Sequence, residues 1–212
     1  MNRAILIILL VSGFAVGQET APVKCTENSP ERRGEVGCTI LASRPFVGPL
    51  PKSVYWHIDR FDSLDEAGAK AGANGVATAA HGGFWLMTVE GKTDDHHGGR
   101  HVEWIGPLNL PTADRYTMRV QSSLLVSGTS TPVHTHSGPE VFYIVSGEQC
   151  LETQKVGHRL RAQKVFIMPT DTIHRGRVQK AAMRRALALI LHDAGRPAST
   201  DLSDPPPLVP CK

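Results

Sequence analysis

The stretch that decides the fold is Gly128-Thr-Ser-Thr-Pro-Val-His134-Thr-His136-Ser-Gly-Pro-Glu140-Val-Phe-Tyr-Ile-Val-Ser-Gly147. His134 and His136 are two residues apart, so on a strand both imidazoles leave the same face. Gly138-Pro139 then turns the chain, and Glu140 opens the next strand, where its carboxylate can return beside the two imidazoles. The stretch therefore predicts two strands whose polar side chains meet at one point.

A third imidazole is available from His174, which follows the turn at Pro169-Thr-Asp171. A lone His-x-His pair is more often a pair of surface or partly buried histidines, and a lone Glu at a strand start is usually solvated. The complete spacing is far less expected by chance, and three neutral nitrogens with one carboxylate suit Fe, Mn, Ni, Cu or Zn. We therefore predict that one divalent transition metal is bound by His134, His136, Glu140 and His174. Apolar residues are expected to wall off a dry pocket around it, namely Val141, Ile144 and Ile167.

The spacing from Gly128 to Gly147 resembles the first signature motif of the cupin superfamily without a mismatch. Pro169-x-Asp171-x2-His174 resembles the second motif, which in the family is Gly, five residues, Pro-x-Gly, two residues, His, three residues and Asn. Three positions depart from that pattern: Gln163 replaces the leading Gly, Asp171 the middle Gly and Val178 the Asn. Asp tolerates the left-handed conformation that the middle Gly would adopt.

The resemblance covers roughly residues 116–191 and implies a small jelly-roll barrel with the metal inside. It implies open coordination positions for water, dioxygen or substrate, and so a metal-dependent oxidoreductase (dioxygenase), isomerase or lyase acting on a small polar organic molecule. In some relatives the corresponding site is empty and the barrel merely binds. A non-catalytic module that binds a small ligand is therefore the alternative function.

The rest of the chain also predicts an all-β fold. Short strand patterns separated by Gly, Pro and Ser turns are typical of an antiparallel sandwich or barrel. One helix is expected from the capping box Ser63-Leu-Asp-Glu66 to about Lys70. We predict strands over 54–58, 84–89, 101–105, 116–126, 131–136, 140–145, 148–153, 164–168, 173–178 and 185–191.

We divide the chain into a signal peptide (1–17), an N-terminal arm with the helix and added strands (18–112), the cupin β-barrel (113–193) and a Pro-rich tail (194–212). The signal peptide follows from Asn2-Arg3, an apolar run and small residues before Gln18, and it predicts a secreted or periplasmic protein. The arm's strands either extend the barrel sheet or pair across a homodimer. A degenerate first cupin over 40–112 is the alternative architecture.

Export affects how the four cysteines are interpreted. In an oxidising compartment an even count favours two disulfides, with three possible connectivities. Cys25 and Cys38 flank a short polar loop, so we expect Cys25–Cys38, which leaves Cys150–Cys211. Free buried thiols are the alternative.

The composition excludes some partners. With 23 basic and 20 acidic residues the net charge is +3, and aromatic residues are 6% of the chain, which argues against a nucleic-acid surface. We expect no membrane contact after signal cleavage, and a small molecule as the ligand or substrate.

Several other polar residues are interpreted as structural or as facing away from the site. The stretch from 94 to 101 is expected to be a solvated loop, and His158 an exposed residue after a turn. Tyr143 and Arg175 should point away from the site, because each is an odd number of residues from a predicted ligand. Arg184-Arg185 is interpreted as a pair of charges at a strand start and not as an anion site. Structural roles are expected for His57 and His192, and His81 is expected to lie in a turn.

Overall fold

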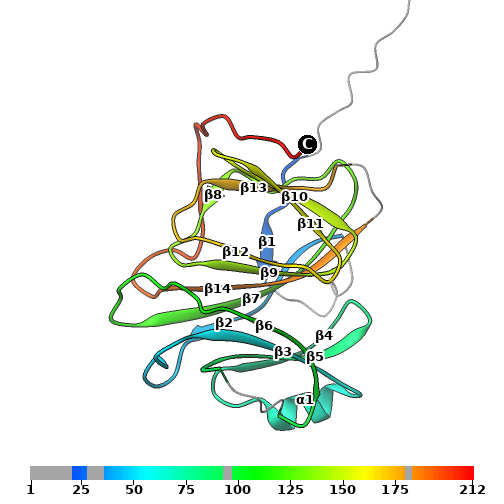
Figure 1. Ribbon diagram of the computed structural model, residues 1–212, viewed down its shortest axis with the longest axis vertical. Coiled ribbons are helices and arrows are strands. Elements are labelled where there is room, and N and C mark those ends of the chain that lie inside the picture. Colours follow the sequence, from blue (N-terminus) through cyan, green and yellow to red (C-terminus); the bar gives the residue numbers. More distant parts are fainter. Residues whose placement is uncertain (1–20, 28–35, 93–96, 180–182) are drawn as a thin grey trace, which may run out of the picture.

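The computed structural model describes residues 21–27, 36–92, 97–179 and 183–212, so the predicted signal peptide lies outside the described residues. Over these ranges the regular secondary structure is almost entirely β, with a single short helix, and the strands form three sheets stacked as layers (Figure 1). The layers confirm the all-β prediction. No helix within the described ranges is long and apolar enough to cross a membrane.

The central layer is a six-stranded sheet in the order β1-β2-β7-β14-β9-β12. β1 and β2 pair in parallel, and the other neighbours pair antiparallel. Both faces of this sheet are covered by other sheets, so its strands bury side chains on both sides. The strands are Cys25–Glu27 (β1), Gly37–Pro45 (β2), Tyr116–Leu125 (β7), Arg184–Asp193 (β14), Glu140–Ser146 (β9) and Val165–Met168 (β12).

The upper layer is a five-stranded sheet in the order β11-β10-β13-β8-β15, and it faces the central sheet (Figure 1). Together these two sheets contain all the strands predicted from the barrel segment. The strands of the upper sheet are Gly157–Arg161 (β11), Glu148–Thr153 (β10), His174–Arg177 (β13), His134–Thr135 (β8) and Thr200–Asp201 (β15).

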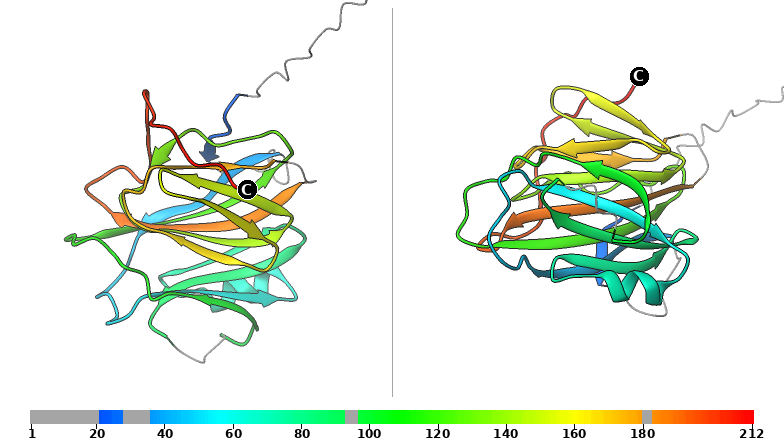
Figure 2. Two further views of the ribbon diagram at one scale, coloured as in Figure 1. Left: turned by 45° about the horizontal axis from the view of Figure 1, so that its top comes forward. Right: turned by 60° about the horizontal axis from the view of Figure 1, so that its bottom comes forward.

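The lower layer is a four-stranded sheet in the order β4-β5-β3-β6, with the helix α1 (Leu64–Lys70) on its outer side (Figure 2). The side chain of Ser63 accepts a hydrogen bond from the backbone N–H of Glu66, as the capping box predicts. The strands are Gly75–Ala80 (β4), Gly83–Glu90 (β5), Tyr55–Phe61 (β3) and Arg100–Ile105 (β6).

The largest apolar core lies between the central and lower sheets. Fully buried side chains come from both layers: Trp56, Ile58 and Met87 below, and Met118, Val120, Leu187, Leu189 and Leu191 above. Burying one such aliphatic side chain stabilises the fold by about 1.5–3 kcal/mol. Tyr143 points away from Glu140, as predicted, but it contributes to this core because the lower sheet covers it.

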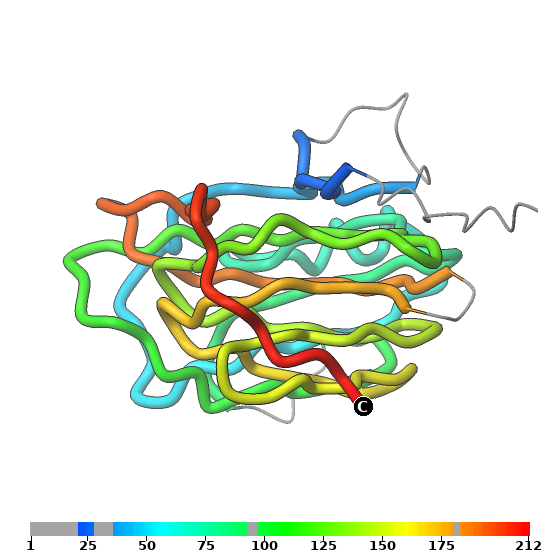
Figure 3. Tube along the Cα trace, turned by 90° about the horizontal axis from the view of Figure 1, so that it is seen from above, coloured from blue at the N-terminus to red at the C-terminus, as the bar shows by residue number. Residues whose placement is uncertain are grey.

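Two disulfides confirm the predicted pairing. Cys25–Cys38 joins neighbouring residues of β1 and β2, and Cys150–Cys211 ties the C-terminal tail to β10. The tail runs across the upper sheet (Figure 3), where Val209 forms an isolated bridge with Thr153. The tail thereby becomes part of the upper layer.

Five strands have no counterpart among the predicted ones, namely β1, β2, β4, β11 and β15. β2 has a mostly half-buried pattern without clean alternation, and it extends the central sheet by pairing with β7. β11 is an edge strand with one buried residue, Leu160. The expected exposure of His158 was wrong, because its ring packs on Phe166 with centroids 4.5 Å apart. The division of the chain into domains stays a prediction.

Candidate metal centre

The four side chains predicted to bind metal lie between the central and upper sheets. His134 and His174 are paired residues of β8 and β13 in the upper sheet, and His136 follows β8. Glu140 begins β9 in the central sheet and faces them. All four are buried, with His134 the most exposed at 9%. Two sheets therefore bring the four polar side chains to one point in the interior.

The turn between His136 and Glu140 depends on Gly138. A Cβ atom at this position would collide with the carbonyl oxygen of Leu191, because the turn lies directly against β14. The second motif uses two residues with left-handed backbone: Asp171 has φ 57° and Gln163 has φ 61°. Both stand where the family pattern has Gly, and the expectation for Asp171 is confirmed.

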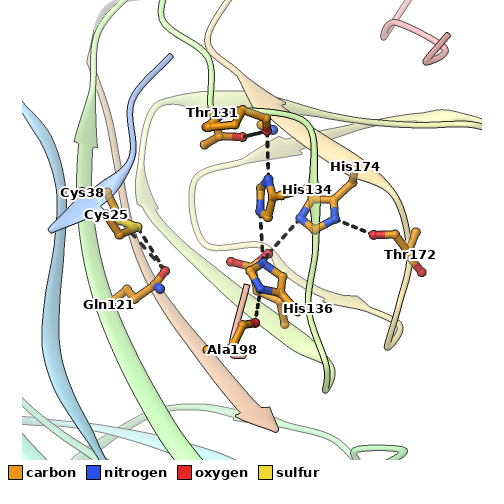
Figure 4. A network of polar contacts seen from close by, with 12 residues as sticks. Cys25, Cys38, Gln121, Thr131, His134, His136, Thr172, His174 and Ala198 are labelled. Atoms are coloured by element: carbon orange, nitrogen blue, oxygen red, sulfur yellow. Dashed lines mark hydrogen bonds and ion pairs between the residues drawn. A yellow bond between two sulfur atoms is a disulfide. The ribbon is translucent and has the colours of Figure 1, made fainter. Parts of the chain in front are cut away.

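Backbone carbonyls fix the orientation of the three imidazoles (Figure 4). The Nδ1 atoms of His134 and His136 each lie 2.8 Å from a carbonyl oxygen, of Pro132 and Ala198 respectively. The Nδ1 of His174 lies 2.9 Å from the carbonyl oxygen of Thr172. A carbonyl oxygen only accepts, so each Nδ1 carries the proton and donates it. In the neutral rings, each Nε2 therefore presents a lone pair to the centre of the cluster.

These lone pairs converge with the Glu140 carboxylate. The Nε2 atoms of His134 and His136 are 3.1 Å apart, and Glu140 Oε2 is 3.1 Å from Nε2 of both His136 and His174. The four ligand atoms all lie within 4.8 Å of one another. Two ligands bound to one ion at about 2.1–2.2 Å and at right angles lie about 3 Å apart. The donor atoms and their spacing therefore fit one divalent transition metal.

The charges of the cluster respond to its burial. Burial, and then repulsion from the imidazoles of His174 and His136, lower the pKa of His134 to about 4. Burial alone would raise the pKa of Glu140, but the imidazoles of His136 and His174 hold it well below its usual range. For His136, burial is outweighed by the Glu140 carboxylate, which raises the pKa. At neutral pH the cluster thus has an ionised carboxylate and a neutral His134, both of which favour a cation.

The cluster forms part of the wall of a cavity of about 350 Å³ between the two sheets. Gly176, two residues after His174, also lines it. The predicted apolar wall was wrong for Val141 and Ile167, because both pack toward the lower sheet. Ile144 is buried in the small core between the sheets and does not line the cavity. The apolar wall is made instead by Leu125, Phe142, Leu151 and Ala188.

His57 and His192 have the structural roles expected of them, and His81 lies in a turn as expected. His57 Nε2 lies 3.0 Å from the carbonyl oxygen of Gly91, and His81 Nε2 lies 3.1 Å from that of Ala186. His192 Nδ1 lies 2.8 Å from the carbonyl oxygen of Asp193. None of these contacts points to the cluster. Of the polar loop 94–101, residues 94–96 lie outside the described residues.

Charged and amide side chains near the cavity were missed as site residues. Arg175 points away and pairs with Glu152, as expected. Arg184 begins β14, but its side chain is buried and lines the cavity together with Arg119 and Gln149. The alternation on β14 carried a signal, because small Ala186 and Ala188 share the parity of Arg184, whereas large leucines occupy the other parity.

Residues 123–188 match the model of the cupin domain family, so the chain contains a cupin domain. A sequence comparison with curated proteins found no match.

Solved structures that match part of this chain include a cupin-like protein from Thermotoga maritima. That match has a TM-score of 0.38 and 15% identity, and it covers 40% of this chain and 64% of that chain. They also include the DMSP lyase DddQ from Ruegeria pomeroyi, with a TM-score of 0.35 and 20% identity. That match covers 39% of this chain and 42% of the lyase chain. A third is the polyketide cyclase RemF from Streptomyces resistomycificus, with a TM-score of 0.34 and 20% identity. That match covers 42% of this chain and 62% of the cyclase chain. The chain thus spans less than two thirds of each of these proteins.

Proposed function

We propose that this chain, a cupin over residues 123–188, is an exported metal-dependent enzyme that acts on a small polar organic molecule. His134, His136, Glu140 and His174 are the proposed metal ligands. The observation that carries the proposal is the convergence of three imidazole Nε2 atoms and a carboxylate oxygen on the wall of a 350 Å³ cavity. A purely structural cluster has no need to border space that a small molecule can fill.

The residues of this chain prepare the site in two ways. The carbonyls of Pro132, Thr172 and Ala198 hold the protons on the three Nδ1 atoms, which keeps the Nε2 atoms free to bind. Apolar side chains such as Phe142 and Leu151 line part of the cavity and lower the local dielectric, which strengthens electrostatic interactions beside them. A bound transition metal supplies a Lewis acid or a redox centre at this position.

Export is supported by the two disulfides, which form and persist in oxidising compartments. The proposed signal peptide over residues 1–17 is consistent with that compartment. We retain the proposed division into a signal peptide, an arm, a barrel and a tail. A homodimer through the arm is part of the same proposal.

The test combines metal analysis with turnover. Protein purified from its own exported compartment is analysed for transition metals and assayed for oxygen consumption and product formation on a panel of small organic acids and sugar derivatives. We expect about one metal ion per chain, the stoichiometry of one mononuclear site, and turnover that is lost in the double variant His134→Ala/His136→Ala. Metal-loaded protein without turnover on any substrate would favour the non-catalytic binding module, and metal-free protein would contradict the metal site.

A further inference from the structure

We propose that the ligand of the cavity is a small organic carboxylate, whose carboxylate group is bound by Arg184 and Gln149 at the end of the cavity distant from the metal cluster. The inference deepens the proposed function and rests on it for the role of the metal end. It is carried by charge, by unpartnered buried polar atoms and by strand register.

The charges that line the cavity favour an anion. Lys24, Arg119 and Arg184 are the cations, and Glu140 and Asp201 are the carboxylates. Lys24 and Asp201 pair with each other at 2.5 Å. The remaining charged side chains are Arg119, Arg184 and Glu140, so the lining of the cavity has a net charge of +1. A bound divalent metal ion would raise this charge to +3. Within the described ranges, neither arginine has a carboxylate oxygen within 4 Å, so the excess positive charge is available to a ligand.

Arg184 is the more buried of the two arginines, with 3% of its surface exposed. Its Nη1 donates a hydrogen bond to Ser123 Oγ, which leaves the opposite edge of the guanidinium, made by Nε and Nη2, unused by that contact. Nε is buried and has no hydrogen-bond partner among the described residues. Two parallel N–H groups on one edge match the two oxygens of a carboxylate. Burying this charge is costly unless an anion compensates it.

Gln149 faces the same space from the upper sheet. Its side chain is 1% exposed, and neither Oε1 nor Nε2 has a hydrogen-bond partner within the described part of the chain. Buried amides are normally hydrogen-bonded, so an unpartnered one that lines a cavity indicates a ligand with a polar group. Gln149 follows the turn at Ser146-Gly147, and Ser146 pairs with Arg185, the neighbour of Arg184. Arg184 and Gln149 therefore lie at the same end of the cavity.

Strand register separates this end from the metal cluster. Ile190 of β14 pairs with Glu140 on one side and with Arg119 on the other, so Arg119 lies at the level of the cluster. Arg184 is six residues before Ile190 on β14, which corresponds to about 20 Å along the backbone. Because the side chains point inward, the distance between their polar ends is shorter than this. Phe142 and Ala188 line the wall between the two ends. The cavity thus fits a molecule with a carboxylate at one end, a short apolar body, and a second polar group at the metal end.

Calorimetric titration tests the proposal with propionate, succinate and benzoate, each compared with its uncharged amide. The full-length protein is titrated both as purified with its metal and after chelation. The variants are Arg184→Gln and Gln149→Leu. Arg185→Gln is the matched control, because it removes the same charge one residue further along the strand. The side chain of Arg185 lines a different pocket.

We expect at least one of the acids to bind and its amide not to bind. Arg184→Gln should weaken that binding about 10- to 100-fold, as loss of a charged hydrogen-bonding partner does. Gln149→Leu should weaken it about 3- to 10-fold, as loss of a neutral hydrogen bond does, and Arg185→Gln should leave it unchanged. If Arg184→Gln does not fold, Arg184→Lys and Gln149→Leu decide, and both must weaken binding.

Three results would overturn the proposal: no acid binds at millimolar concentration, acids and amides bind equally, or binding of the acid is unaffected by Arg184→Gln and Gln149→Leu. Inorganic phosphate bound through Arg184 in preference to all three acids would also overturn the carboxylate assignment. The metal content of the protein as purified separates this proposal from the proposed function. Arg184-dependent binding in a protein that holds no metal in its own compartment would leave the carboxylate site standing and contradict the metal-dependent enzyme.

Discussion

On β14, the odd-numbered residues Leu187, Leu189 and Leu191 pack against the lower sheet, whereas Arg184 and Ala188 point toward the upper sheet and line the cavity. One strand thus supplies a close-packed apolar core on one face and the wall of a polar cavity on the other. β9 repeats the contrast, because Val141 and Tyr143 enter the core while Glu140 and Phe142 line the cavity. The lower sheet therefore lets the central sheet use one face for stability and the other for binding.

The comparison implies that changes on the two faces have separable effects. Substitutions toward the lower sheet should change the free energy of unfolding and leave binding intact. Those toward the upper sheet should change binding. The upper layer also has a smaller apolar core and depends more on covalent cross-linking.

The largest expected effect concerns the disulfide of the upper layer. Replacing both Cys150 and Cys211 with Ser should lower the free energy of unfolding by about 4 kcal/mol, because the bridge closes the longer of the two loops. The matched variant without Cys25–Cys38, whose cysteines are 13 residues apart, should lose about 3 kcal/mol. Urea unfolding measures both, and a larger loss for the short loop would contradict the account.

A core substitution sharpens the comparison from the other face. Leu189→Ala should lower the free energy of unfolding by about 3 kcal/mol, since Leu189 is fully buried against the lower sheet. Metal stoichiometry should not change, because the side chain points away from Glu140. Urea unfolding and elemental analysis of the same preparation check both statements. Loss of the metal in a variant that is still folded would show that the two faces are coupled.

The pH dependence of stability tests the lower sheet by itself. Burial lowers the pKa of His57, with Glu90 opposing the shift, and the side chain has no exposed surface. The unfolded chain binds this proton below about pH 6.5, but the folded chain resists it. The stability that His57 contributes is therefore complete above that pH and decreases as the pH falls through and below it.

The His57→Gln variant isolates this contribution. Unfolding free energies are measured between pH 5 and pH 8 for the variant and the original protein. The original protein should lose more stability on acidification than the variant does. A difference between the two proteins that is the same at every pH would contradict the assigned role of His57.

The smallest expected effect is a gain in stability at the turn before β12. Gln163 has left-handed backbone, which costs a residue with a Cβ atom about 1 kcal/mol relative to glycine. Gln163→Gly, which restores the family residue, should therefore raise the free energy of unfolding by about 1 kcal/mol. Gln163→Ala is the control and should give no gain. A loss of stability in the glycine variant would contradict the assigned strain.

The sequence predicted the cluster of four side chains better than it predicted some of the strands. His134, His136, Glu140 and His174 could be found because strand parity and turn residues are local properties that bring them together. Strand β2 was missed because its place depends on pairing with β7, about 80 residues away in the sequence, and not on its own alternation.

The cavity walls were harder to predict for a related reason. Val141 was expected at the metal, but its parity is opposite to that of Glu140, and the lower sheet that covers it comes from a distant segment. Arg184 was interpreted as a charge at a strand start. Its burial depends on the upper sheet closing over β14, which no local pattern around Arg184 shows.

Anomalous X-ray scattering from a crystal of the protein loaded with zinc tests the central claim most directly. The account predicts one strong peak between the two facing sheets. It should lie about 2.0–2.2 Å from Nε2 of His134, His136 and His174 and from a carboxylate oxygen of Glu140. A zinc-loaded crystal with its peak elsewhere, or with none between these four side chains, would contradict the account.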